Sequence, residues 1–242
     1  MTNRATSGVA NPSSAIFIGN SFFYYNNGIT THLTQMLLAA KPAHKWRSTL
    51  VGISGAGLDW HDVESYFRPN AIGSFSFTPE NNIVFNRLER LFDVAVMMDG
   101  SQSPVHPDLV SASRDFTRRH CDTARKHGAA PVLFMTWAYA DKPDMTTPLA
   151  EAYARMGEEN DALVIPAGLA FARAIAQRPR LDLWHADKRH PSLAGTYLST
   201  CLTYAALFES SPVGVPYDAG LGAETAGFLQ TIARDTLRDY LA

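Results

Sequence analysis

Residues 94–104, VAVMMDGSQSP, begin with a continuous apolar run at 94–98, which ends abruptly in the polar and turn-forming residues 99–104. An apolar run of this length without alternation predicts a strand that is buried on both faces, as the central strands of parallel sheets are. Ligands of open α/β sheets bind beyond the carboxyl ends of such strands. The polar residues that follow Met98 therefore indicate one side of a binding site.

The same arrangement recurs before and after this stretch. Four more segments predict strands, at 15–19, 49–53, 132–136 and 162–165. Apolar residues at helical spacing predict helices at 29–40, 58–67, 83–91, 109–127, 149–160, 169–177 and 197–208. Residues 69–82 show no clear period and predict an excursion on the surface. Strands that alternate with helices predict an α/β domain whose five-stranded parallel sheet is covered on both sides.

Length and composition are typical of one globular domain. The chain has 242 residues, of which 46% are hydrophobic and 18% charged, and its net charge of −2 comes without a basic block. We therefore expect a single domain over residues 1–242, with a flexible segment at 1–14, and no nucleic-acid partner. The two cysteines, Cys121 and Cys201, are too few for a disulfide framework and predict buried free thiols.

The ends of the sequence give two further expectations. The first residues lack the apolar stretch of a secretory signal, and no run is long enough to span a membrane, so we expect a cytoplasmic protein without membrane contact. Residues 223–241 have apolar residues at helical spacing. This tail is expected to pack on the sheet or on a second subunit, which leaves a homo-oligomer open.

Ser21 ends the sequence GNS at residues 19–21, directly after the first predicted strand. Serines are common in turns and helix caps, so this residue alone does not establish a site. Far along the chain, Asp187 and His190 stand three residues apart, just before a predicted helix. Serine hydrolysis needs an imidazole that takes the hydroxyl proton and a carboxylate that orients this imidazole. The three residues together predict such chemistry.

Gly55 and Gln102 follow the second and third predicted strands. A glycine lets a backbone N–H approach a substrate closely, and a side-chain amide can donate from another side. Both residues therefore suit an oxyanion hole, although a turn glycine and a loop glutamine are also common without that role.

With these four blocks in order along nearly the whole chain, the sequence resembles the SGNH hydrolases, also called GDSL-like esterases and lipases. The resemblance implies a three-layer α/β/α sandwich with the flavodoxin-like strand order 2-1-3-4-5. That order would place the loop of Ser21 between the loops of Gly55 and Gln102. The block around His190 resembles the family most closely. The sequence Asp187-x-x-His190-Pro191-Ser192-x-x-Gly195 continues into an apolar helix, as the corresponding block of the family does.

The resemblance also implies roles for the site residues. Ser21 would be the nucleophile, His190 the base and Asp187 its partner, while the Ser21 and Gly55 amides and the Gln102 side chain would form the oxyanion hole. Two blocks depart from the family pattern. The first is Gly-Asn-Ser-Phe where the family usually has Gly-Asp-Ser-Leu, and the third has Gln102 where the family usually has Asn.

The predicted activity is hydrolysis of a small or carbohydrate-linked acyl ester through an acyl-enzyme, without a cofactor. Acyl transfer to another alcohol would use the same residues. Polar and aromatic side chains at the crevice end predict substrate contacts. These residues are Asn20, Phe22, Trp137 and Tyr139.

Two other classes of function compete with this prediction. His185, Asp187 and His190 form a His-x-Asp-x-x-His cluster whose imidazoles and carboxylate suit zinc or manganese, and would serve a metal-dependent hydrolase. A catalytically weak ligand-binding homologue would keep the architecture and lose efficient chemistry through the change to Gln102.

Overall fold

The computed structural model describes residues 11–40, 45–68, 71–72, 75–85 and 88–242. Its main sheet has five parallel strands in the order β2-β1-β5-β6-β7. Counted along the chain within this sheet, the order is 2-1-3-4-5, which confirms the expected topology. The strands are β1 (Ser14–Gly19), β2 (Arg47–Gly52), β5 (Val94–Met97), β6 (Ala130–Phe134) and β7 (Leu163–Ile165).

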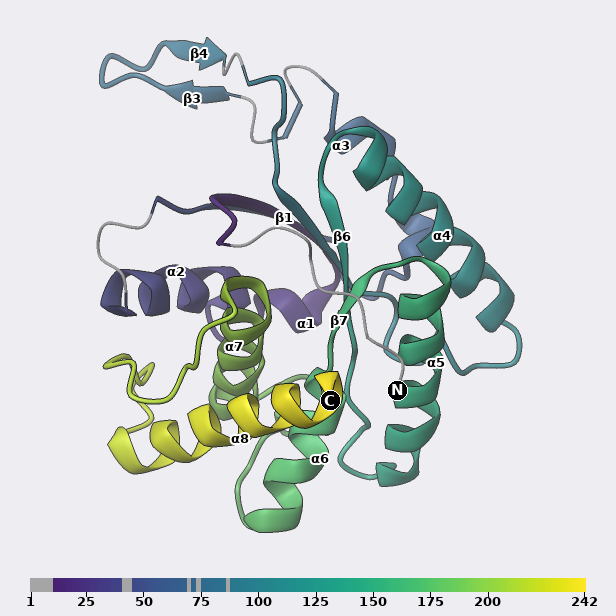
Figure 1. Cartoon of the computed structure of the whole chain (residues 1–242), viewed down its shortest axis with the longest axis vertical. Coiled ribbons are helices and arrows are strands. Elements are labelled where there is room, and N and C mark those ends of the chain that lie inside the picture. The colour runs from purple at the N-terminus through teal and green to yellow at the C-terminus, as the bar shows by residue number, and fades with distance from the viewer. Residues whose placement is uncertain (1–10, 41–44, 69–70, 73–74, 86–87) are drawn as a thin grey trace.

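Helices cover both faces of this sheet, as Figure 1 shows, and complete the three expected layers. One side holds α2 (Gly28–Ala40), α6 (Ala167–Gln177), α7 (Leu193–Phe208) and α8 (Ala223–Leu241). The other holds α3 (Val63–Tyr66), α4 (Val110–Lys126) and α5 (Thr146–Glu159). The short elements α1 (Ser21–Tyr24), η1 (Leu58–Trp60) and η2 (Pro143–Met145) lie in loops that follow strands.

The two faces of the sheet have separate hydrophobic cores. In β1, Ala15 and Phe17 belong to the core with α2, α6, α7 and α8, whereas Ile16 and Ile18 belong to the core with α4 and α5. All four side chains have no exposed surface. This burial explains why residues 15–18 are a continuous apolar run, since both faces of β1 are covered.

The strands end at one common edge. Gly19 of β1 lies opposite Gly52 of β2, and Ile18 lies opposite Met97 of β5. The loops after these three strands therefore start side by side. This register brings the segments that begin at Asn20, Ile53 and Met98 together.

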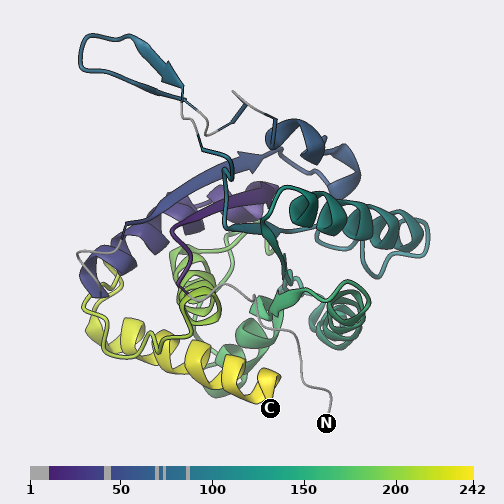
Figure 2. The same ribbon diagram turned by 45° about the horizontal axis from the view of Figure 1, so that its top comes forward.

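The prediction of a helix at 83–91 is wrong. Residues 75–85 form an antiparallel hairpin of β3 (Phe75–Phe77) and β4 (Ile83–Phe85), which extends away from the body (Figures 1 and 2). The turn between the strands contains Asn81 with a φ of +67°, a conformation that asparagine tolerates better than most residues. The helix predicted at 58–67 is likewise divided into η1 and α3.

The chain before β1 and the tail can be compared with their predictions. Strand β1 begins at Ser14, and the Ser13 backbone N–H and hydroxyl both donate to Asp93, while residues 1–10 lie outside the described part. Helix α8 shares the hydrophobic core of α6 and α7.

Within the described residues, no helix is both long and apolar enough to cross a bilayer. Both cysteines are buried and free, as predicted.

Candidate active site

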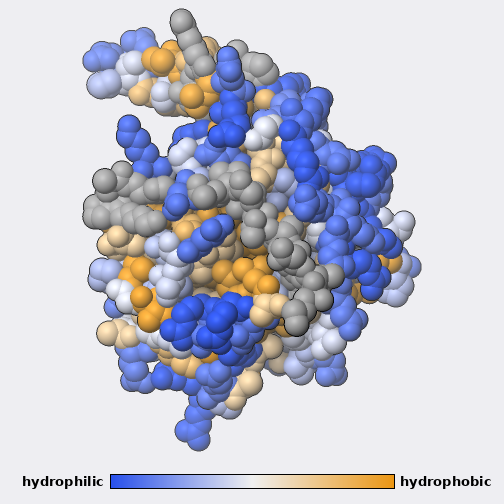
Figure 3. Space-filling model, in the orientation of Figure 1, coloured by the Kyte–Doolittle hydropathy of each residue, from blue (hydrophilic) through white to orange (hydrophobic). Residues whose placement is uncertain are grey.

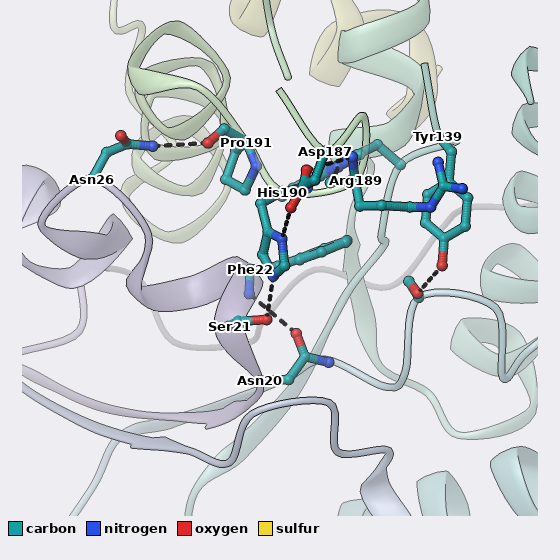
Figure 4. A network of polar contacts seen from close by, with 11 residues as sticks. Asn20, Ser21, Phe22, Asn26, Tyr139, Asp187, Arg189, His190 and Pro191 are labelled. Carbon is teal, nitrogen blue, oxygen red and sulfur yellow. Dashed lines mark hydrogen bonds and ion pairs between the residues drawn. The ribbon is translucent and has the colours of Figure 1, made fainter. Parts of the chain in front are cut away.

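Ser21, His190 and Asp187 form a chain of hydrogen bonds at the carboxyl edge of the sheet (Figure 4). Ser21 Oγ lies 2.8 Å from His190 Nε2, and His190 Nδ1 lies 2.5 Å from Asp187 Oδ2. Ser21 is the first residue of α1, and the other two belong to the loop before α7. The structure therefore brings together the three residues that the sequence analysis selected from opposite parts of the chain.

The carboxylate of Asp187 determines where the imidazole proton lies. An ionised carboxylate can only accept, so His190 Nδ1 carries the hydrogen and Nε2 of the neutral ring accepts from the Ser21 hydroxyl. Burial raises the pKa of Asp187, but hydrogen bonds from the His190 ring and from the Arg189 and His190 backbone N–H groups outweigh it and lower this pKa to about 2. Asp187 thus stays ionised at neutral pH.

The loop that carries His190 is closed at its base and attached to the loop after β6. The His185 N–H donates to the His190 carbonyl over 2.7 Å, and Trp184 pairs with Pro191 in an antiparallel bridge. The Trp137 indole N–H donates to the Arg189 carbonyl at 3.0 Å. These bonds fix the backbone on both sides of His190, and the Asp187 carboxylate and the Tyr25 ring then hold the imidazole in place.

Asn20 joins three loops beneath the site. Its Oδ1 accepts from the Phe22 N–H, and its Nδ2 donates to the carbonyls of Ala56 and Asp99 at 2.9 and 3.2 Å. The residue is only 4% exposed. Because all these polar atoms are already paired with protein, the substrate contact predicted for Asn20 has no free side-chain donor to carry it. The geometry indicates a positioning role.

Ser21 and Gly55 both line a hollow at the carboxyl edge of the sheet, and each has a backbone N–H group. Neither group has an acceptor among the described residues. Gly55 adopts a φ of +73°, and an added Cβ would meet no atom within 4 Å, so its backbone is open to the hollow. Unpaired N–H groups next to a hydroxyl are suited to hold a negative oxygen.

Gln102 does not share this arrangement. Its side-chain Nε2 lies 3.8 Å from Met145 Sδ and donates to it, and Gln102 is not among the residues that line the hollow. The residue that the third block contributes to the lining, besides Gly100, is Ser101. The oxyanion contact expected for the Gln102 amide would thus need the side chain to leave Met145.

Phe22 and Trp137 belong to a column of aromatic rings next to Ser21. Trp137 stacks on Phe22 at 4.6 Å and on Phe171 at 4.4 Å between ring centroids. Trp137 has no exposed surface. The substrate contact predicted for Trp137 is therefore wrong for this structure, because the indole lies in the hydrophobic core. Phe22 is 5% exposed and lines the hollow with one edge of its surface.

The hollow has a volume of about 500 Å³ and opens beside Ser21. Tyr25 and Tyr139 line it together with Arg189. The Tyr25 ring lies parallel to the His190 ring, with centroids 4.0 Å apart and 11° between planes. Tyr139 lines the hollow as the sequence analysis expected. Arg189 was missed, because only the tertiary structure shows which neighbours of the histidine lie at the hollow.

The metal alternative can be compared with the same geometry. Both ring nitrogens of His190 are directed at Ser21 and Asp187, and the His185 ring lies edge-on to Tyr25 at 6.0 Å. Across the described ranges of the chain, no three His, Cys, Asp or Glu side chains are grouped as metal ligands. The arrangement instead suits proton transfer between a hydroxyl and an imidazole.

Solved structures share this fold. A DUF4886 family protein from Bacteroides uniformis superposes with a TM-score of 0.66 at 16% identity, over 95% of this chain and 96% of that one. A protein from Slackia heliotrinireducens described as an SGNH hydrolase gives 0.57 at 21% identity, over 80% and 97%. The fold is that of the SGNH hydrolases. An acetylxylan esterase from Geobacillus stearothermophilus, in a catalytic mutant, gives 0.59 at 14% identity, over 82% and 95%.

Sequence comparison adds nothing to these structural similarities. No family model and no curated protein matches the chain. The resemblance noted in the motifs is thus supported through the SGNH fold rather than through overall sequence identity.

Proposed function

We propose that this SGNH-fold protein is a serine ester hydrolase that acts on small acyl esters. The observation that carries the proposal is the Ser21–His190–Asp187 chain of hydrogen bonds at the carboxyl edge of a parallel sheet. This edge is where open α/β sheets bind ligands. The hydrolases and esterases among proteins of the same fold agree with this function.

In the proposed reaction, His190 Nε2 takes the Ser21 proton while Ser21 Oγ attacks the ester carbonyl. The Ser21 and Gly55 N–H groups hold the oxygen anion that develops. Collapse of the tetrahedral adduct breaks the bond to the alcohol, which leaves with the proton from His190. Water then attacks the acyl-enzyme while His190 takes one of its protons, and collapse of this second tetrahedral adduct breaks the bond between Ser21 Oγ and the acyl group. The carboxylic acid leaves, and His190 returns the proton to Ser21. Asp187 stabilises the imidazolium in both halves of the reaction.

The aromatic column limits the acyl group. Phe22, Trp137 and Phe171 fill the space behind Ser21 with rings stacked at 4.4–4.6 Å, so no apolar channel for a long chain starts there. Rings packed at this distance leave no room for methylene groups without displacement. We expect acetyl and propionyl esters to react faster than octanoyl esters.

A set of three proteins tests the proposal. Wild type is expected to hydrolyse 4-nitrophenyl acetate and to be labelled covalently by a fluorophosphonate. Ser21→Ala is expected to lose the label, and Ser21→Ala and His190→Ala to lose activity by about a thousandfold or more. Thermal unfolding checks that each variant is folded. Equal activity of the three proteins rejects the proposed nucleophile and base.

A further inference from the structure

We infer that Ser101, Tyr139 and Arg189 form a subsite that binds the alcohol part of the ester and selects a neutral polyhydroxylated ring such as a sugar. The inference rests on the proposed function and adds the substrate class to it. The three residues line the same hollow as Ser21. They come from the loops after β5 and β6 and from the loop before α7.

The two hydroxyl groups of the subsite are paired with each other. Ser101 Oγ lies 2.6 Å from Tyr139 Oη. One of the two protons is used in this bond, so the pair still offers one O–H donor and several lone pairs to the hollow. A donor and an acceptor side by side match a ligand that itself carries neighbouring hydroxyl groups. An apolar alcohol would leave the remaining O–H donor and lone pairs of Ser101 and Tyr139 without a ligand partner.

Arg189 adds donors without adding a net charge. Its guanidinium lies 4.1 Å from the centre of the Tyr139 ring, and its Nη1 donates to Asp141 at 2.7 Å. Asp141 compensates the cation, so the site does not favour an anionic alcohol. The remaining guanidinium N–H groups stay available because the group has five donors in a fixed plane.

The subsite lies on the side of Ser21 where the leaving alcohol of the ester would be placed. In Figure 4, Tyr139 and Arg189 lie together to one side of the Ser21–His190 pair, and Asn26 lies to the other. The aromatic column closes the space behind Ser21, which leaves the open hollow for the alcohol. Tyr24 Oη and Ser54 Oγ form a second hydroxyl pair on the lining, so both walls are rich in hydroxyl groups.

Two esters of equal acyl group and similar ring size test the inference. Methyl 6-O-acetylglucopyranoside keeps three free hydroxyl groups, whereas cyclohexylmethyl acetate has the same kind of leaving alcohol and none. Wild type is expected to prefer the sugar ester in kcat/KM by about tenfold or more. Tyr139→Phe and Ser101→Ala are each expected to raise KM for the sugar ester by about two- to tenfold, the effect of one lost hydrogen bond. Cyclohexylmethyl acetate should change by less than about twofold.

Controls separate the subsite from the chemistry. Ser76→Ala, on the exposed hairpin, should leave both esters unaffected, and thermal unfolding shows that each variant folds. Equal losses on both esters, or a wild-type preference for cyclohexylmethyl acetate, overturn the inference. If wild type hydrolyses 4-nitrophenyl acetate but neither of these two esters, the inference is overturned and the proposed function stands. If wild type hydrolyses none of the three esters, the proposed function fails, and an NMR titration of Ser21→Ala with methyl 6-O-acetylglucopyranoside decides the subsite. Binding that Tyr139→Phe weakens then supports it, and absence of binding overturns it.

Discussion

The imidazole of His190 has aromatic neighbours as well as polar ones. The parallel Tyr25 ring at 4.0 Å is the nearer, and the Phe22 ring meets the imidazole edge-on at 5.4 Å. A ring face beside a cation is attractive, so on the proposed mechanism this contact favours the imidazolium that forms when Ser21 attacks. In that mechanism Tyr25 both positions the base and stabilises its charged form.

Replacement of the Tyr25 ring tests this role. Tyr25→Leu is expected to lower kcat for 4-nitrophenyl acetate by about three- to tenfold, because a cation–π contact of about 1 kcal/mol is lost. Tyr25→Phe keeps the ring and should stay within about twofold of wild type. Steady-state kinetics of the two variants measure the difference. Equal effects of Leu and Phe would show that the ring face does not contribute.

Individual residues of the site differ in how far the sequence predicts them. Ser21, Asp187 and His190 could be selected because each stands at a strand exit or helix start with a specific spacing. Gln102 and Trp137 occupy equally suggestive positions, yet one pairs with Met145 and the other enters the core. The direction of a loop side chain depends on partners far away in sequence, and no local pattern contains them.

Among the elements, the β3–β4 hairpin is the least covered. Its cross-strand pairs, Phe75 with Phe85 and Phe77 with Ile83, place four large apolar side chains on one face. All four are more than 40% exposed. Figure 3 shows apolar surface gathered on this arm at the upper left. Two-stranded hairpins are marginally stable alone, so this element contributes little to the stability of the body.

Serine substitutions on the hairpin should therefore leave the body intact. The double variant Phe77→Ser, Phe85→Ser is expected to shift the melting temperature by less than about 3 °C, because exposed side chains contribute within about 0.5 kcal/mol each. It should also scatter less light at high protein concentration, since the exposed apolar area falls. A fall of the melting temperature beyond about 8 °C would mean that these rings pack on the body.

The hairpin also shows where sequence patterns lead to a wrong element. The helix prediction at 83–91 followed the apolar residues of that segment. The turn formers Thr78-Pro79-Glu80-Asn81-Asn82 separate two short apolar segments, FSF at 75–77 and IVF at 83–85, and this pattern is the signal for two strands. By contrast, four strands of the main sheet, β1, β5, β6 and β7, were predicted because burial on both faces makes them almost uniformly apolar.

At the scale of the whole molecule, Asp99 connects the loops after β2 and β5. Its Oδ1 accepts from the N–H groups of Leu58 and Gly100 at 2.9 and 2.7 Å, and its side chain is almost completely buried. Burial raises the pKa of Asp99 above the ordinary 3.8, although hydrogen bonds from these groups oppose the shift. The folded protein therefore holds the Asp99 proton more tightly than the unfolded chain.

This difference links Asp99 to stability. A raised pKa in the folded state gives stabilisation that is complete below about pH 3.8 and is lost as pH rises through the folded-state value. Asp99→Asn keeps an oxygen that accepts from Leu58 and Gly100 but cannot ionise. We expect the variant to gain stability relative to wild type as pH rises from 4 to 7, measured by urea denaturation. A difference that is independent of pH would contradict this linkage.

Ser21 and His190 are 169 residues apart in sequence, yet share one hydrogen bond. On the proposed mechanism, a nascent chain that has emerged from the ribosome only through β7 carries its nucleophile without a base. Acyl chemistry at Ser21 then becomes available only after translation has passed the segment before α7 and that segment has docked. On this mechanism, the growing chain cannot hydrolyse esters until that segment is in place.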